Sequence, residues 1–228
     1  MFTDFYHSFY YIILIIGALT GLVLVRSVSA PFKWVAILLI ATIASEFVAK
    51  YYTAVTHTIN NNPVYHFFTV IEYSVYAIIY QRFFNKKGWT RLLTYSVAVF
   101  LIAEIANTAL FQSLRETPTN MFILESLVLI FLSLYLFLQV RSNMAYDNLL
   151  KEGILWFNCA ILCYYSFNIL IWGFHSIKVY QLTNPPTIIY SLLLLLSGLL
   201  YIVFIIALLL EYFYKRAQKN NNDTTLNY

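Results

Sequence analysis

Seven long apolar runs account for most of this sequence and limit what it can fold into. A helix needs about 20 predominantly apolar residues to cross the roughly 30 Å hydrocarbon core of a bilayer. The runs are too continuous for the strands of a membrane β-barrel, which alternate in polarity over about ten residues. The sequence therefore predicts an all-α polytopic membrane protein, a bundle of seven transmembrane helices. The runs are Ser8–Val25, Trp34–Val55, Val64–Phe84, Leu92–Phe111, Asn120–Val140, Gly153–Phe174 and Thr187–Phe213.

The composition supports this class of protein and excludes others. The 228-residue chain is 61% hydrophobic and 11% charged, whereas a soluble domain carries about 25% charged residues. A soluble enzyme, a disordered chain and a disulfide scaffold are therefore excluded. The connections between the runs are too short to hold a soluble module. We expect one domain over residues 1–214, then a short polar cytoplasmic tail over residues 215–228, and no nucleic-acid partner.

Lysine and arginine residues fall mainly on one side of the predicted bundle. Only Arg115 and Lys178 lie on the other side. Because positively charged loops stay in the cytoplasm, the sequence predicts an outside N-terminus and a cytoplasmic C-terminus, in a bacterial inner membrane. The basic segment Arg82–Arg91 is a candidate contact for a cytoplasmic or membrane protein partner. The residues on the basic side are Arg26, Lys33, Arg82, Lys86, Lys87, Arg91, Arg141, Lys151, Lys215, Arg216 and Lys219.

Five ionisable residues lie well inside the apolar runs: Glu46, Lys50, Glu72, Glu104 and Glu125. A charge in a transmembrane helix costs about 2.5 kcal/mol or more, and it marks a candidate functional site. Counting residues at about 1.5 Å of rise each predicts that Glu46, Glu72 and Glu104 share one depth just outside the midplane. Lys50 and Glu125 are expected nearer the outer surface.

Other polar side chains share helical faces with these charges. We expect an outward-opening polar pocket between the second and sixth runs, which binds a small ligand from the outer face or protons. The alternative is that the polar groups join helices by hydrogen bonds, and that Glu46 and Lys50 form an ion pair within one helix. The predicted ligand- or proton-binding residues are Glu46, Lys50, Glu72, Tyr76, Glu104, Asn107, Glu125 and Asn168.

The charge balance of this set favours a cationic ligand. Four carboxylates face one ammonium group, and crowded carboxylates in a poorly hydrated site cannot all stay charged without protons or a cation. We therefore expect a non-enzymatic, receptor-like or sensory protein that binds a small cationic or amine-bearing ligand. The alternative is a proton-coupled small-solute transporter, and a third possibility is a membrane-embedded lipid hydrolase. The nearly apolar inner halves Val128–Leu138 and Leu199–Leu210 favour a closed pocket over a transport path.

The histidines are weak metal candidates. His57, His66 and His175 fall on the predicted outer side, but the chain contains no H-x-x-x-H or H-E-x-x-H pattern that would point to zinc. The last run has no lysine for a retinal Schiff base, and no glycine-rich phosphate loop occurs. We therefore assign no catalytic residue, no metal and no cofactor.

Four short segments within residues 30–85 resemble those of a group of bacterial membrane proteins. They are Phe32-Lys33-Trp34, Ser45-Glu46, Asn61-Asn62-Pro63-Val64-Tyr65-His66 and Ile71-Glu72-Tyr73. In this region the chain resembles small seven-helix membrane proteins of bacteria of the Bacteroidetes kind, whose genomes are AT-rich. The resemblance implies the seven-helix topology and importance for Glu46 and Glu72. It implies no activity, because that group has none assigned.

Overall fold

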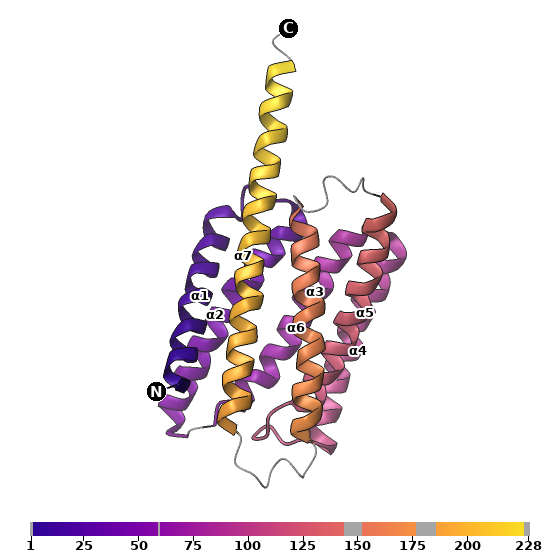
Figure 1. Ribbon diagram of the computed structural model, residues 1–228. Coiled ribbons are helices and arrows are strands. Elements are labelled where there is room, and N and C mark those ends of the chain that lie inside the picture. The colour runs from indigo at the N-terminus through magenta and orange to yellow at the C-terminus, as the bar shows by residue number, and fades with distance from the viewer. Residues whose placement is uncertain (1, 59, 144–151, 177–185, 226–228) are drawn as a thin grey trace.

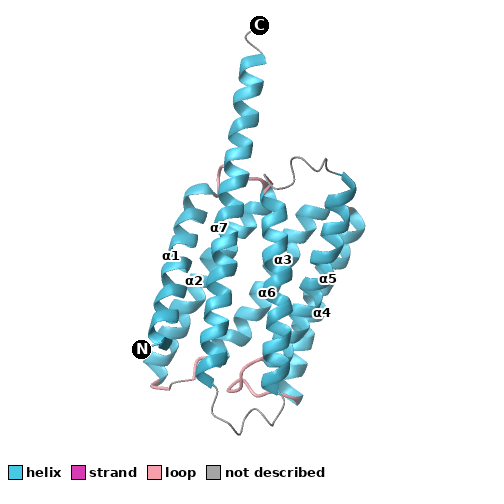
Figure 2. Cartoon of the chain, viewed as in Figure 1, coloured by secondary structure: helices cyan, strands magenta, loops and turns pink. Residues whose placement is uncertain are grey.

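The computed structural model describes the backbone of residues 2–58, 60–143, 152–176 and 186–225. It also describes the side chains of these residues, except for some next to the longer gaps and the chain ends. Within these ranges the chain is entirely helical apart from its connections, and no strand occurs. Seven α-helices run roughly antiparallel to one another (Figures 1 and 2). They are α1 (Phe2–Leu24), α2 (Ala30–Thr56), α3 (Asn62–Phe84), α4 (Lys87–Leu110), α5 (Thr119–Asn143), α6 (Gly153–Ser176) and α7 (Pro186–Thr225).

Six of these helices are long and apolar enough to cross a membrane, which confirms a multi-pass membrane protein in the helical class. The helix that falls short is α3, the third predicted run. It carries His66, Glu72, Gln81 and Arg82 together with several tyrosines. The six candidate spans are Phe5–Leu24, Ala30–Thr56, Lys87–Leu110, Thr119–Val140, Gly153–Gly173 and Ile189–Gln218.

The position of α3 explains its polarity. It packs against α2, α4 and α5, and its buried residues include His66, Thr69, Tyr73, Tyr76 and Tyr80. Protein side chains therefore surround much of a helix whose polar groups would be costly against lipid. The other neighbours in the bundle are α1 with α2 and α7, α6 with α5 and α7, and, with smaller contacts, α2 with α7 and α4 with α5.

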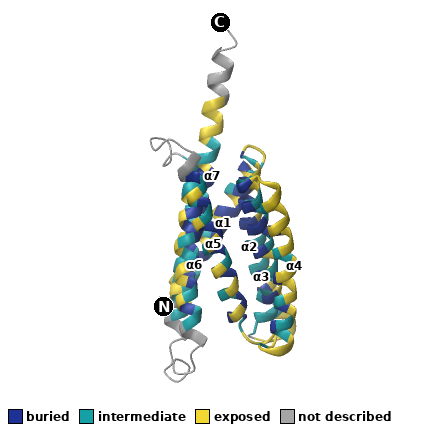
Figure 3. Ribbon diagram, turned by 90° about the vertical axis from the view of Figure 1, so that its right-hand side faces the viewer, coloured by how far each residue is buried: buried dark blue, intermediate teal, exposed yellow. Residues whose placement is uncertain are grey.

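Aromatic side chains fill the centre of the bundle, between the layers that Figure 3 shows edge-on. Phe157 and Phe204 are fully buried and stack at 5.1 Å between ring centroids. Nearby, the hydroxyl of Tyr80 donates to Asn158 Oδ1 at 3.1 Å, and Asn158 Nδ2 donates to the Ser133 carbonyl oxygen at 2.9 Å. The buried polar groups in this part of the core therefore satisfy one another.

Two glycines of α1 allow close helix contacts inside the bundle. A Cβ atom on Gly21 would lie 3.2 Å from the backbone of Ala36 in α2. A Cβ atom on Gly17 would lie 3.3 Å from Leu39 and 3.5 Å from Ile205 in α7. The Gly17–Gly21 spacing thus serves packing within one chain.

The last helix continues beyond the bundle. The helical backbone of α7 runs to Thr225, past Phe213 where the apolar run ends, and it projects at the end opposite the N-terminus (Figure 1). The α1–α2 and α3–α4 connections lie at that same end. The basic residues of these connections and those of α7 up to Arg216 are therefore on one side of the molecule.

A partly buried carboxyl at this end makes stability depend on pH. Partial burial and the nearby carboxylate of Glu211 raise the pKa of Glu152, which lies just before α6. A carboxyl with a raised pKa binds its proton more tightly in the folded state, so its stabilising contribution is present at low pH and is lost as the pH rises through the folded pKa. We expect thermal unfolding to show this loss in the wild type and to show less of it in E211Q. An unchanged pH profile in E211Q would contradict the assignment.

Candidate functional site

A polar pocket of about 260 Å³ lies at the end of the bundle where α1 begins. Six helices, all but α4, and the α4–α5 connection contribute to it, so helices far apart in the sequence meet around one space. We call it the Glu46 pocket, after its one membrane-embedded carboxylate. Its lining residues are His7, Tyr10, Tyr11, Glu46, Asn61, Asn62, Tyr65, Thr117, Phe122, Trp172, Tyr190, Leu193, Leu194 and Ser197.

Two tyrosines of α1 hold the Glu46 carboxylate. Tyr10 Oη donates to Glu46 Oε1 at 2.9 Å, and Tyr11 Oη donates to Glu46 Oε2 at 3.0 Å. Hydrogen bonds to a carboxylate acceptor are stronger than those between neutral groups, so the two tyrosines fix the position of the Glu46 side chain. Each oxygen keeps further lone pairs for a third partner.

Lys50 does not neutralise Glu46. Its ammonium nitrogen lies 3.9 Å from the centre of the Tyr11 ring, which is a cation–π contact. Among the described side chains, no ion pair joins Lys50 to Glu46, although the two residues are one helical turn apart. Lys50 is exposed and lines an adjoining, mostly apolar depression of about 450 Å³ between α1 and α2, which shares His7, Tyr11 and Glu46 with the Glu46 pocket.

Aromatic rings form about half of the remaining wall of the Glu46 pocket. Tyr190 of α7 lies beside His7, with 5.2 Å between the ring centroids, and Trp172 of α6 contacts Phe122 at 5.1 Å. The faces of such rings attract organic cations, by about 0.5–2 kcal/mol per contact. A carboxylate among aromatic rings is chemically suited to a small amine or quaternary ammonium ion.

A second polar cluster lies deeper in the bundle, around Glu72 and Glu125. Tyr165 Oη donates to Glu72 Oε1 at 3.3 Å, and Glu125 is close enough to Glu72 for their charges to interact. Asn168 Nδ2 donates to Ser126 Oγ at 3.4 Å. Three buried polar atoms in this region have no partner, namely Glu125 Oε1, Tyr76 Oη and Asn168 Oδ1. Buried polar atoms without partners are rare in proteins, so this cluster can hold protons, water or part of a ligand.

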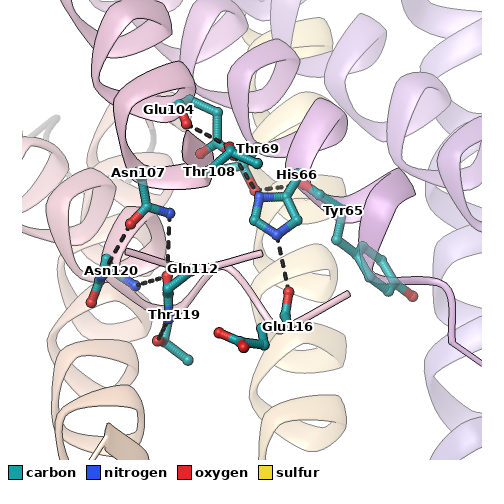
Figure 4. A network of polar contacts seen from close by, with 10 residues as sticks. All are labelled: Tyr65, His66, Thr69, Glu104, Asn107, Thr108, Gln112, Glu116, Thr119 and Asn120. Carbon is teal, nitrogen blue, oxygen red and sulfur yellow. Dashed lines mark hydrogen bonds and ion pairs between the residues drawn. The ribbon is translucent and has the colours of Figure 1, made fainter. Parts of the chain in front are cut away.

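A third cluster pairs His66 with Glu104 (Figure 4). His66 Nδ1 lies 2.5 Å from Glu104 Oε1, and His66 Nε2 lies 3.0 Å from the Glu116 carbonyl oxygen. A carbonyl only accepts, so Nε2 must carry a hydrogen. The contact between Nδ1 and Oε1 then holds one shared proton, which makes the pair electrically neutral wherever that proton lies.

Asn107 belongs to a neighbouring set of hydrogen bonds that joins α4 to α5. Asn107 Nδ2 donates to Gln112 Oε1 at 3.2 Å, Asn120 Nδ2 donates to Asn107 Oδ1 at 3.0 Å, and Gln112 Nε2 donates to Thr119 Oγ1 at 2.6 Å. These contacts hold the short connection between the two helices (Figure 4). The geometry gives Asn107 a structural role at that connection.

The structure therefore distributes the predicted residues over three places. Glu46 lines the polar pocket, with Lys50 outside it. Glu72, Tyr76, Glu125 and Asn168 form the deeper cluster, and Glu104 and Asn107 belong to the clusters of Figure 4.

The structure pairs Glu104 with His66, which lies six residues before Glu72 on α3. Six residues correspond to about 9 Å along that helix. The common depth of Glu46, Glu72 and Glu104 in the membrane stays a prediction.

Sequence reasoning missed the contribution of α1 and α7 to the Glu46 pocket. Tyr10 and Tyr11 lie 36 and 35 residues before their acceptor, and a pocket between the second and sixth runs leaves them out. The available signal was a cluster of aromatic residues from Phe5 to Tyr11, around the start of the first run. Aromatic side chains with one polar tip are typical of sites where part of the ring is dry and the tip has a partner.

The histidines named as weak metal candidates do not gather. His57 adopts a left-handed conformation (φ 52°) after the last residue of α2, His66 pairs with Glu104, and the side chain of His175 lies outside the described residues. Across the described part of the chain, no three His, Cys, Asp or Glu side chains are placed to hold one metal ion.

Comparison with known proteins assigns this chain to no family. No protein-family model, no curated protein and no solved structure matches this chain. What defines the molecule is therefore its own fold and sites, a multi-pass helical membrane protein with a carboxylate pocket at one end.

Proposed function

We propose that this protein binds a small organic cation in the Glu46 pocket and acts as a receptor-like or sensory protein. The observation that carries the proposal is the Glu46 carboxylate, which accepts hydrogen bonds from Tyr10 and Tyr11, lies among aromatic rings and forms no ion pair with any described side chain. Neutral hydroxyl donors leave the negative charge of Glu46 uncompensated. A cationic ligand would supply that compensation and would stack against the rings.

The residues beneath the floor of the Glu46 pocket favour binding of a ligand over its transport through the bundle. Tyr201, Phe204 and Phe157 are buried beyond it, and together with Tyr80 and Phe84 they fill the core towards the opposite end. A solute would have to separate these close-packed rings to cross. We therefore put the receptor-like role first.

A proton-coupled transporter is the second candidate, because one observation supports it. Ser197 lines the Glu46 pocket, and its hydroxyl lies 3.2 Å from Tyr164 Oη. Tyr164 is the neighbour in α6 of Tyr165, which donates to Glu72. The pocket thus adjoins a cluster that holds two carboxyl groups and three buried unpartnered polar atoms. That cluster would carry the coupled proton.

The proposed orientation in the membrane follows from the uneven distribution of lysine and arginine between the two ends of the bundle. All seven helices would span a bacterial inner membrane, with α3 sheltered by its neighbours and the Glu46 pocket open to the outside. The exposed Arg82, Lys86, Lys87 and Arg91 would then lie in the cytoplasm, where we propose that a protein partner receives the signal.

Binding is tested by thermal unfolding of the purified protein with tetramethylammonium, choline and 2-phenylethylamine. We expect at least one of these cations to raise Tm by about 5 °C at a hundredfold excess over Kd. The uncharged choline isostere 3,3-dimethylbutan-1-ol should have no such effect. E46Q should lose the shift, because the amide keeps the size of the side chain and removes its charge.

The matched control is E211Q, which removes a carboxylate at the opposite end of the bundle. It should retain the shift of the wild type. Equal shifts in wild type and E46Q, or equal shifts with choline and its uncharged isostere, would contradict the proposal. Cation-dependent proton uptake into proteoliposomes that disappears in E72Q would favour the transporter.

A further inference from the structure

An apolar groove of about 520 Å³ runs between α3 and α4, apart from the Glu46 pocket. Its walls include Phe67, Ile71, Leu101 and Ile105, which are 69%, 50%, 45% and 61% exposed. Because α4 is long and apolar enough to cross a membrane and α3 packs beside it, we expect these exposed side chains to face acyl chains. The groove would then be open to the hydrocarbon part of the bilayer.

The same groove is lined by His66 and Glu104, the proton-sharing pair of Figure 4. Their side chains are 2% and 8% exposed. A neutral but strongly polar pair at the floor of an apolar groove is an unusual combination, because polar groups that face lipid are costly.

One atom of this pair has no partner. Glu104 Oε1 contacts both His66 Nδ1 at 2.5 Å and Thr108 Oγ1 at 3.3 Å. Glu104 Oε2 is buried and forms no hydrogen bond. Because the shared proton lies between Nδ1 and Oε1, Oε2 offers lone pairs and no hydrogen. It can be satisfied only by a hydrogen-bond donor.

We propose that this groove binds a single-chain amphiphile with a hydroxyl head group. The hydroxyl donates to Glu104 Oε2, and the hydrocarbon chain lies along Phe67, Ile71, Leu101 and Ile105. A neutral donor fits better than an ammonium ion because the His66–Glu104 pair has no net charge to compensate. This site is independent of the Glu46 pocket and of the function proposed for it.

The test is photo-crosslinking of the full-length protein in lipid nanodiscs with a hexadecanol that carries a diazirine in its chain. We expect labelled peptides from residues 62–84 and 87–110. Unlabelled 1-hexadecanol should compete about tenfold better than 1-methoxyhexadecane, which has the same chain but no donor. Equal competition by the ether, or labelling spread evenly over all lipid-facing helices, would overturn the proposal.

A second pair of variants tests the groove without touching the polar pair. I105W fills the groove with a bulky ring and should reduce labelling about tenfold. I102W adds the same ring at a position on α4 that is 65% exposed and lies outside the groove, so it should label like wild type. Wild-type labelling of I105W, or equal loss in both variants, would overturn the assignment of the site to this groove.

Discussion

Replacing His66 by alanine is expected to destabilise the protein by about 3–5 kcal/mol. The substitution removes the partner of Glu104 Oε1 and leaves a carboxyl group that is almost fully buried. It also removes the donor to the Glu116 carbonyl oxygen, which holds the α4–α5 connection against α3. Breaking one half of a buried pair costs more than the pair contributes as a whole, because the remaining group stays desolvated without compensation.

A double-mutant cycle in detergent micelles, with unfolding followed by added dodecyl sulfate, measures this coupling. H66A and E104A should each lose several kcal/mol, and the double variant should lose clearly less than their sum. T108V removes only the longer contact to Glu104 Oε1, which is 3.3 Å, and should cost much less than H66A. Additive losses in H66A and E104A would mean that the two side chains do not act as a pair.

The second large effect is expected at Gly153, the first residue of α6. A Cβ atom there would overlap with the carbonyl oxygen of Ala207 in α7 and would lie 2.9 Å from Phe32 Cζ in α2. The clash involves backbone, which cannot rotate away, so α6 would have to shift from α7. We expect G153A to lose about 3 kcal/mol, at the upper end of what overpacking costs.

The matched control for this variant is G88A. A Cβ atom on Gly88, in the first turn of α4, meets nothing within 4 Å. Thermal unfolding should show a large drop in Tm for G153A and little change for G88A, because alanine is also the better helix former. Equal Tm values for the two variants would show that α6 and α7 are not in close contact at this point.

The helices could be predicted largely from local sequence. Each predicted run corresponds to one helix, and the ends differ by a few residues at most positions; Val64–Phe84 became Asn62–Phe84, for example. The larger differences include those where a polar segment continues an apolar helix, as residues 87–91 do at the start of α4 and residues 214–225 do at the end of α7. Hydropathy locates the apolar part of a helix, whereas backbone hydrogen bonds continue through polar residues that have good helix propensity.

The candidate site was predictable only in part. The apolar runs made each buried glutamate conspicuous, since ionisable residues are rare there. The partners of these glutamates were not conspicuous. Tyrosine is common in this chain, with 20 residues, so the aromatic cluster near the N-terminus did not single out Tyr10 and Tyr11 as the donors to Glu46. Likewise the sequence offered His66 only as a weak metal candidate, and its pairing with Glu104, 38 residues away, was not predicted.

The class of this protein, its helices and its buried ionisable residues follow from the amino-acid sequence, because these features depend on composition and on periods of a few residues. Which of the ionisable residues meet follows only from the way the helices pack. Whether Glu46 faces Tyr10, or Glu104 faces His66, depends on the rotation and tilt of two helices about their axes. Packing of side chains along the whole contact sets those angles, and no local pattern in the sequence encodes them.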